Sequence, residues 1–184
     1  DPKANRVVEF VLSDFENLNP YNSSDANATY AEEQIFQRLI TANPKTLEYN
    51  VPVLADSLPV ESADHLTFDF RIRKGIKWPN GSELTGKDVI FSLKALKNPF
   101  NVQSAQKRVY VDPIHSAELI DGDPYHVRFK LWKPYFLIRK ATFGDVLYIL
   151  PKYLFDPDNL TDQYSWDDIA SIIEHSGNKS LDSA

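Results

Sequence analysis

The chain has 184 residues, a formal net charge of −6, and 42% hydrophobic and 25% charged residues. The acidic balance argues against a nucleic-acid partner, because such binders normally carry a basic patch, and against an anionic membrane surface. The sequence contains no cysteine, which excludes disulfides, zinc–thiolate sites and cysteine nucleophiles.

The first predicted unit is a strand, a polar loop and a helix. Residues 7–12 (VVEFVL) have the β-branched and aromatic composition of a buried strand. Residues 17–28 are rich in Asn, Ser, Asp and Pro, which indicates a loop. In the following stretch, residues 29–40, Thr29 and Glu32 have capping-box spacing, and an apolar face predicts a helix.

The loop between this strand and this helix is the candidate binding site. Open α/β sheets place ligands outside the carboxyl ends of their strands, which is where this loop would lie. Its hydrogen-bonding candidates are Asn22, Ser24, Asp25 and Asn27. The local pattern by itself favours a structural role, because Asn, Asp and Ser are also the residues that turns use.

The middle of the chain predicts antiparallel strands and a capped helix. Residues 66–72 (LTFDFRI) alternate between apolar and polar positions, as a half-buried strand does. Thr85 and Asp88 form a second capping box, which starts a helix. Residues 116–121 and 125–132 flank Gly-Asp-Pro and predict a hairpin.

The last part predicts a buried strand at residues 146–150 (VLYIL) and a helix opened by a capping box of Ser165 and Asp168. Residues 175–184 are polar and without pattern, as expected of a frayed or cut end. The sequence has no methionine, even at position 1, so we expect that a leader was removed or that a segment was excised. No apolar run reaches the 18 or more residues of a membrane span.

No pattern for catalysis, phosphate or metal binding stands out. Basic residues crowd the turn at Gly75, but the glycine spacing there fits neither phosphate-binding motif. The basic residues are Arg71, Arg73, Lys74 and Lys77. The four histidines lack the spacing of a zinc motif. We therefore predict no catalytic residue, no metal and no cofactor.

The order of several short motifs resembles the N-terminal part of the dipeptide- and oligopeptide-binding proteins of ABC transporters, family 5 of the extracytoplasmic solute-binding proteins. The motifs are Leu18-Asn19-Pro20, PVLADSL at 52–58, RKGIKW at 73–78, Asn80-Gly81 and TGKDV at 85–89. The sequence departs from the family pattern at three positions. Asn19 replaces an aspartate, Arg38 a glycine and Leu58 a tryptophan.

The resemblance implies an α/β fold, a periplasmic-binding-protein-like (type II) lobe. On this view residues of about 1–50 begin lobe I, about 51–145 form a small extra subdomain with antiparallel hairpins, and about 146–184 return to lobe I. A hinge and a second lobe would lie beyond residue 184. The basic run at 71–77 would then be scaffold rather than a phosphate site.

The resemblance also implies a function without covalent chemistry. The expected role is extracytoplasmic binding of a solute, with di- or oligopeptides as the leading class, for delivery to ABC permease subunits. The expected location is the periplasm or the cell surface. Export would use an N-terminal leader that is then removed, and the leader of a lipoprotein is one form that fits. Two alternatives stay open at this point: a hydrolase built on converging carboxylates, and a module of the same fold that senses its ligand.

Overall fold

The computed structural model describes residues 14–15, 17–23, 25–101 and 104–175. The predicted strand at 7–12 and the polar end at 176–184 lie outside these residues. The elements follow in the order α1 (Ala26–Ile35), β1 (Ile40–Thr41), β2 (Val51–Pro52), β3 (Val60–Glu61), β4 (Thr67–Arg71), α2 (Gly86–Lys97), α3 (Ala105–Arg108), β5 (Ile114–Leu119), β6 (His126–Leu131), the π-helix η2 (Ile138–Val146), α4 (Lys152–Phe155), the 3₁₀-helix η3 (Leu160–Gln163) and α5 (Trp166–His175).

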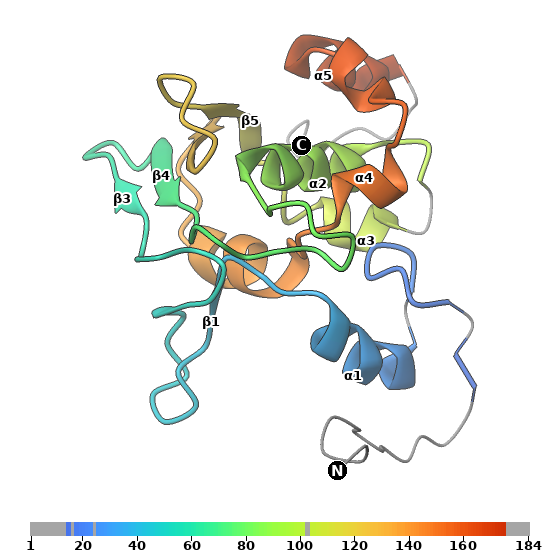
Figure 1. The fold of residues 1–184 in the computed structure, drawn as a ribbon. Coiled ribbons are helices and arrows are strands. Elements are labelled where there is room, and N and C mark those ends of the chain that lie inside the picture. Colours follow the sequence, from blue (N-terminus) through green and yellow to red (C-terminus); the bar gives the residue numbers. More distant parts are fainter. Residues whose placement is uncertain (1–13, 16, 24, 102–103, 176–184) are drawn as a thin grey trace.

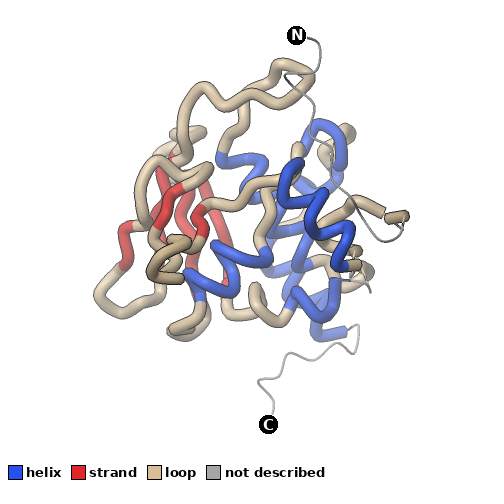
Figure 2. The backbone as a smooth tube through the Cα atoms, turned by 90° about the horizontal axis from the view of Figure 1, so that it is seen from below, coloured by secondary structure: helices blue, strands red, loops and turns tan. Residues whose placement is uncertain are grey.

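The main sheet has four antiparallel strands in the order β3-β4-β6-β5. Phe68 of β4 lies opposite Phe129 of β6, and Phe70 lies opposite Val127. These side chains and Ile72 are buried, so the alternation predicted for this strand is confirmed. The predicted hairpin is confirmed as β5 and β6. Figure 2 shows the strands gathered on one side of the molecule and most helices on the other.

An aromatic cluster joins the sheet to η2, the light-orange, unlabelled helix of Figure 1. Phe143 of η2 is fully buried, with ring centroids 4.8 Å from Phe70, 4.9 Å from Phe129 and 5.7 Å from Phe68. Phe70 also meets Phe129 edge to face at 5.7 Å. Such rings bury much apolar area and gain further from edge-to-face contact. The cluster is therefore the centre of the core.

Two of the predicted capping boxes are present. At α2, Asp88 accepts a hydrogen bond from the Thr85 N–H at 2.9 Å, and the Thr85 hydroxyl oxygen accepts one in return from the first turn. At α5, Asp168 accepts from the Ser165 N–H at 2.8 Å. Asp88 also accepts from the Lys152 N–H at 3.1 Å, which fixes the start of α4 against α2.

The third capping box, at Thr29 and Glu32, was wrongly predicted. The helix α1 begins at Ala26 because Asp25, also a good cap, accepts a hydrogen bond from the Asn27 N–H at 2.9 Å. Glu32 therefore falls in the second turn and is buried. The helix also ends earlier than predicted, at Ile35, and the chain continues into β1, which pairs with β2.

The predicted strand at residues 146–150 is only partly right. Leu147, Tyr148, Ile149 and Leu150 are buried, as expected. Among the described residues, however, this stretch forms only an isolated antiparallel bridge, between Ile149 and Gln37. The N–H of Leu150 donates instead to the Ser92 hydroxyl at 2.8 Å, so a side chain of α2 replaces a strand carbonyl.

The basic run has the scaffold role that the resemblance implied. Arg71 forms an ion pair with Asp123 at 3.2 Å. The Arg73 Nε donates to the Ala55 carbonyl at 2.9 Å, and the Lys74 ammonium lies 5.2 Å from the centre of the Tyr125 ring. These three cations bind neighbouring parts of the fold.

No helix in the described part of the chain is long and apolar enough to cross a membrane.

Candidate ligand-binding loop

The loop that precedes α1 is built around the side chain and carbonyl of Asn19. The Asn19 Oδ1 accepts a hydrogen bond from the Tyr21 N–H at 3.0 Å, and the Asn19 carbonyl accepts from the Asn22 and Ser23 N–H groups, both at 2.9 Å. Asparagine favours such turns because its side chain can bond the backbone two residues ahead. We call residues 19–23 the Asn19 turn.

Tyr21 anchors this turn in the core. It is 1% exposed, and its hydroxyl donates to the Tyr148 carbonyl at 2.5 Å. Burial raises the pKa of Tyr21 well above its usual range, so the hydroxyl keeps its proton. The loop is thus attached to the buried stretch that follows η2, more than 100 residues further along the chain.

Three of the four predicted site residues can be placed. The Asn22 Oδ1 accepts a hydrogen bond from the Asn101 side chain. Asp25 caps α1, and Asn27 is half-buried in the first turn of that helix. Ser24 lies outside the described residues. Asn22 and Asp25 therefore have structural partners, and a role for the four residues in ligand binding stays a prediction.

The sequence did not predict that two charged residues, Lys107 and Glu32, lie next to the loop. The Lys107 ammonium, from α3, donates to the Pro20 carbonyl and, at 2.9 Å, to the Ser23 carbonyl. Glu32 of α1 is 1% exposed. Burial raises the pKa of Glu32, and the charge of Lys107 opposes that rise. No local pattern could reveal this contact, because more than 80 residues separate Lys107 from the turn.

Arg38, one of the departures from the family pattern, holds a polar cluster near the end of α1. Its Nε donates to the Asp145 carbonyl at 2.8 Å, and its guanidinium lies 4.1 Å from the centre of the Tyr148 ring. It also forms an ion pair with Glu33 at 3.0 Å. A hollow of about 280 Å³ opens beside this cluster. It is lined by Glu33, Gln34, Phe36, Gln37, Arg38, Thr41 and Val53.

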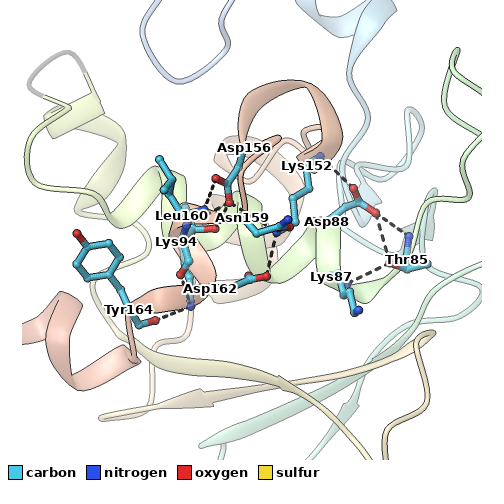
Figure 3. A network of polar contacts seen from close by, with 11 residues as sticks. Thr85, Lys87, Asp88, Lys94, Lys152, Asp156, Asn159, Leu160, Asp162 and Tyr164 are labelled. Carbon is cyan, nitrogen blue, oxygen red and sulfur yellow. Dashed lines mark hydrogen bonds and ion pairs between the residues drawn. The ribbon is translucent and has the colours of Figure 1, made fainter.

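A second hollow, also about 280 Å³, lies between the end of α2, η3 and α5 and has a mainly apolar lining. Figure 3 shows the polar network beside it. The Lys94 ammonium donates to the carbonyls of Thr161 at 2.9 Å and Tyr164 at 2.6 Å. Lys152 forms an ion pair with Asp162 at 3.1 Å. The contacts of Lys94 hold η3 against α2, and the ion pair of Lys152 holds it against α4, so the network is structural.

The Asn19 turn and the start of α1 offer hydrogen-bonding groups. Their side chains are amides, hydroxyls and a carboxylate that already caps a helix. In the described ranges, no group of three or more His, Cys, Asp or Glu side chains is placed to hold a metal ion. That these groups hold a polar ligand by hydrogen bonds stays a prediction.

Comparison with known proteins places this fold in a class. Solved structures of bacterial solute-binding proteins match over most of the chain. NikZ from Campylobacter jejuni, in complex with Ni(L-His), has a TM-score of 0.63 and 29% identity over 80% of this chain and 28% of its own. AppA from Bacillus subtilis, in complex with a nonapeptide, has a TM-score of 0.61 and 26% identity over 83% and 28%. The fold is that of a type II periplasmic binding protein.

The family follows from the sequence match. The family model described as "Bacterial extracellular solute-binding proteins, family 5 Middle" matches residues 50–176. The chain belongs to family 5 of the bacterial extracellular solute-binding proteins.

Two curated relatives agree with this assignment. The glutathione-binding protein GsiB of Escherichia coli K12 is 30% identical over 132 residues, which cover 72% of this chain and 24% of GsiB. A probable ABC transporter-binding protein of Deinococcus radiodurans is 40% identical over 79 residues, covering 43% of this chain and 13% of that protein. The chain thus spans no more than about a quarter of the length of these relatives.

Proposed function

We propose that this protein binds a solute outside the cytoplasm, with peptides as the leading class, and delivers it to the permease of an ABC importer. The observation that carries the proposal is the family match over residues 50–176. Two relatives named above support the peptide class, since GsiB is named for glutathione, a tripeptide, and AppA was solved with a nonapeptide. NikZ, solved with Ni(L-His), supports a wider ligand range for such folds.

The proposed contacts from this chain are those of Asn22, Ser24, Asp25 and Asn27. A peptide presents alternating N–H donors and carbonyl acceptors, and carboxamide side chains can serve both. The Asn19 turn is held rigidly by Tyr21, which lowers the ordering cost of binding. Binding of this kind requires no bond to be made or broken in the ligand, and we propose no catalytic residue and no cofactor.

The proposed division into lobe I and an extra subdomain has support from long-range contacts. The first part, about 1–50, meets the last part, about 146–184, through the bridge of Gln37 with Ile149 and the hydrogen bond of Tyr21 to the Tyr148 carbonyl. The intervening part, about 51–145, contains the four-stranded sheet. A chain that leaves a lobe and returns to it would produce this pattern.

The proposed location is the periplasm or the cell surface. The family description names extracellular proteins, and a lipid anchor at the N-terminus of the mature protein would keep it near its permease. The proposed partners are the ABC permease subunits and the small solute.

A peptide titration followed by two-dimensional ¹H–¹⁵N NMR tests the ligand class and the site together. A complete site with a micromolar Kd has a binding free energy of about −8 kcal/mol. If this chain supplies half of the site, its share is about −4 kcal/mol, which corresponds to a Kd in the millimolar range. We expect a tetrapeptide to shift the amide signals of Asn22, Asp25 and Asn27 saturably at millimolar concentration. The Asn27→Ala variant should weaken the effect, and Asn50→Ala, at an exposed asparagine outside the loop, should not.

Shifts confined to other parts of the chain would contradict the site, and micromolar affinity would contradict the half-site argument. Two further assays separate the alternatives. Turnover of chromogenic glycosides or esters by the chain would favour a hydrolase over a binding protein. Unchanged uptake of the ligand by cells lacking the gene would favour a sensing module over an importer.

A further inference from the structure

The Asn19 turn is held by Asn101 and Lys107, two residues that lie far from it in the sequence. Lys107 of α3 donates to two carbonyls of the turn, those of Pro20 and Ser23, which lie three residues apart. A lysine ammonium carries three donors and can satisfy both at once. Hydrogen bonds from a charged group are stronger than those between neutral groups.

A second tether comes from the same segment. The Asn101 side chain donates to the Asn22 Oδ1. Asn101 is itself fixed by Arg108, which is buried and donates to the Asn101 carbonyl at 2.7 Å and to the Ser104 hydroxyl at 3.3 Å. The two tethers therefore meet the turn at Pro20, Asn22 and Ser23, and both depend on α3.

Burial lowers the pKa of Lys107, and the positive charge of Arg38 adds to that shift. Glu32 is buried on the facing helix α1, and its negative charge interacts favourably with the ammonium. The Glu32 Oε1 has no hydrogen-bond partner among the described residues. A buried carboxylate is costly, and the charge of Lys107 and the Ser23 side chain offset part of that cost.

We propose that Lys107 is a positioning residue for the candidate ligand-binding loop: through its two hydrogen bonds it sets the shape of the Asn19 turn and so the placement of Asn22. The inference rests on the proposed function, which gives the loop its role. It adds to that function a role for α3, which lies in the proposed extra subdomain. Helix α3 shapes the ligand-binding loop but does not contact the ligand.

Amide hydrogen exchange on the 184-residue chain tests the proposal without any ligand. The reporters are the Asn22 and Ser23 amides, which donate to the Asn19 carbonyl. In Lys107→Met we expect these amides to exchange about tenfold faster or more, because two charge-assisted bonds are lost. The amides of β4 and β6 should keep their rates. Lys107→Arg retains the charge and the donors and should bring the rates back to within about threefold of the parent.

The matched control is Lys87→Met, which makes the same change at an exposed lysine of α2. Asn22 and Ser23 rates in Lys107→Met that equal those of Lys87→Met would overturn the proposal. If Lys107→Met does not fold, the same exchange measurement is made on Lys107→Gln, whose side chain is a shorter, neutral hydrogen-bond donor. Selective acceleration at Asn22 and Ser23 in that variant supports the proposal, and unchanged or uniformly raised rates refute it.

The same variants separate this inference from the proposed function. A failed exchange test would remove the positioning role and leave peptide binding as it stands. If the exchange test succeeds, Lys107→Met should also weaken the tetrapeptide affinity at least about fivefold in the NMR titration, through loss of preorganisation. Absence of any peptide binding in the parent chain would instead remove the function and leave the exchange result intact.

Discussion

Replacing Phe143 with alanine should lower the free energy of unfolding by about 4 kcal/mol, in the range measured for large-to-small changes in buried cores. Phe143 is fully buried, and its ring contacts three other phenylalanines, Phe68, Phe70 and Phe129. The cavity would open between η2 and the sheet, where rings cannot easily collapse to fill it. Urea unfolding followed by circular dichroism measures the change.

The control for this prediction is Phe136→Ala, only seven residues earlier in the chain. Phe136 is 92% exposed, so its removal should change the free energy of unfolding by less than about 0.5 kcal/mol. Equal effects of the two substitutions would show that η2 does not pack on the sheet as described.

The second large effect concerns Lys97 and pH. Lys97 is 5% exposed, and its ammonium donates to the carbonyls of Val111 at 3.2 Å and Ile114 at 2.5 Å. Burial lowers the pKa of Lys97 to about 8, and the nearby charge of Asp112 opposes this shift only in part. In the unfolded chain the pKa of a lysine is about 10.4.

Between these two pKa values the unfolded chain binds more protons at Lys97 than the folded chain does. The free energy of unfolding therefore rises with pH in this window. Below about pH 8 the lysine is charged in both states, and the folded state bears the full cost of burying the charge. We expect the stability of the parent relative to Lys97→Met to increase by about 2 kcal/mol from pH 7.5 to 9.5.

The measurement is urea unfolding of parent and variant at matched pH values. Using the difference between the two proteins cancels the other titrating groups. Tyr49 and Tyr148, whose pKa values burial raises to about 12, act above this window and in the opposite direction. Lys87→Met, at an exposed lysine, should show no such trend. A stability difference that is flat with pH would contradict the buried position of the ammonium.

Much of the fold could be predicted because its signals are local. The alternation around Phe68 and Phe70 needs only a strand with one buried face, and the capping boxes at Thr85 and Ser165 need only neighbouring residues. The helix α1 was misplaced for the same reason: two residues, Asp25 and Thr29, could each cap it, and local spacing does not choose between them.

The candidate site was less predictable, because long-range contacts determine it. The polar composition of the loop marked Asn22 and Asp25 as hydrogen-bonding residues, and the structure shows both making internal bonds. Neither Lys107 nor Tyr148 carries a local signal for its contact with the turn. In the stretch at 147–150, burial was predictable from composition, but the replacement of strand pairing by a side chain of α2 was not.

Native mass spectrometry of the natural protein tests the central claim most directly. An antibody raised against these 184 residues can capture it from its own host without denaturation. We expect a mass above that of the polypeptide, and denaturation should release the excess as a set of peptides. An excess that consists of a single non-peptide compound would contradict the peptide class. A polypeptide that carries no bound solute after gentle purification, and takes up no peptide when a mixture is added, would contradict solute binding itself.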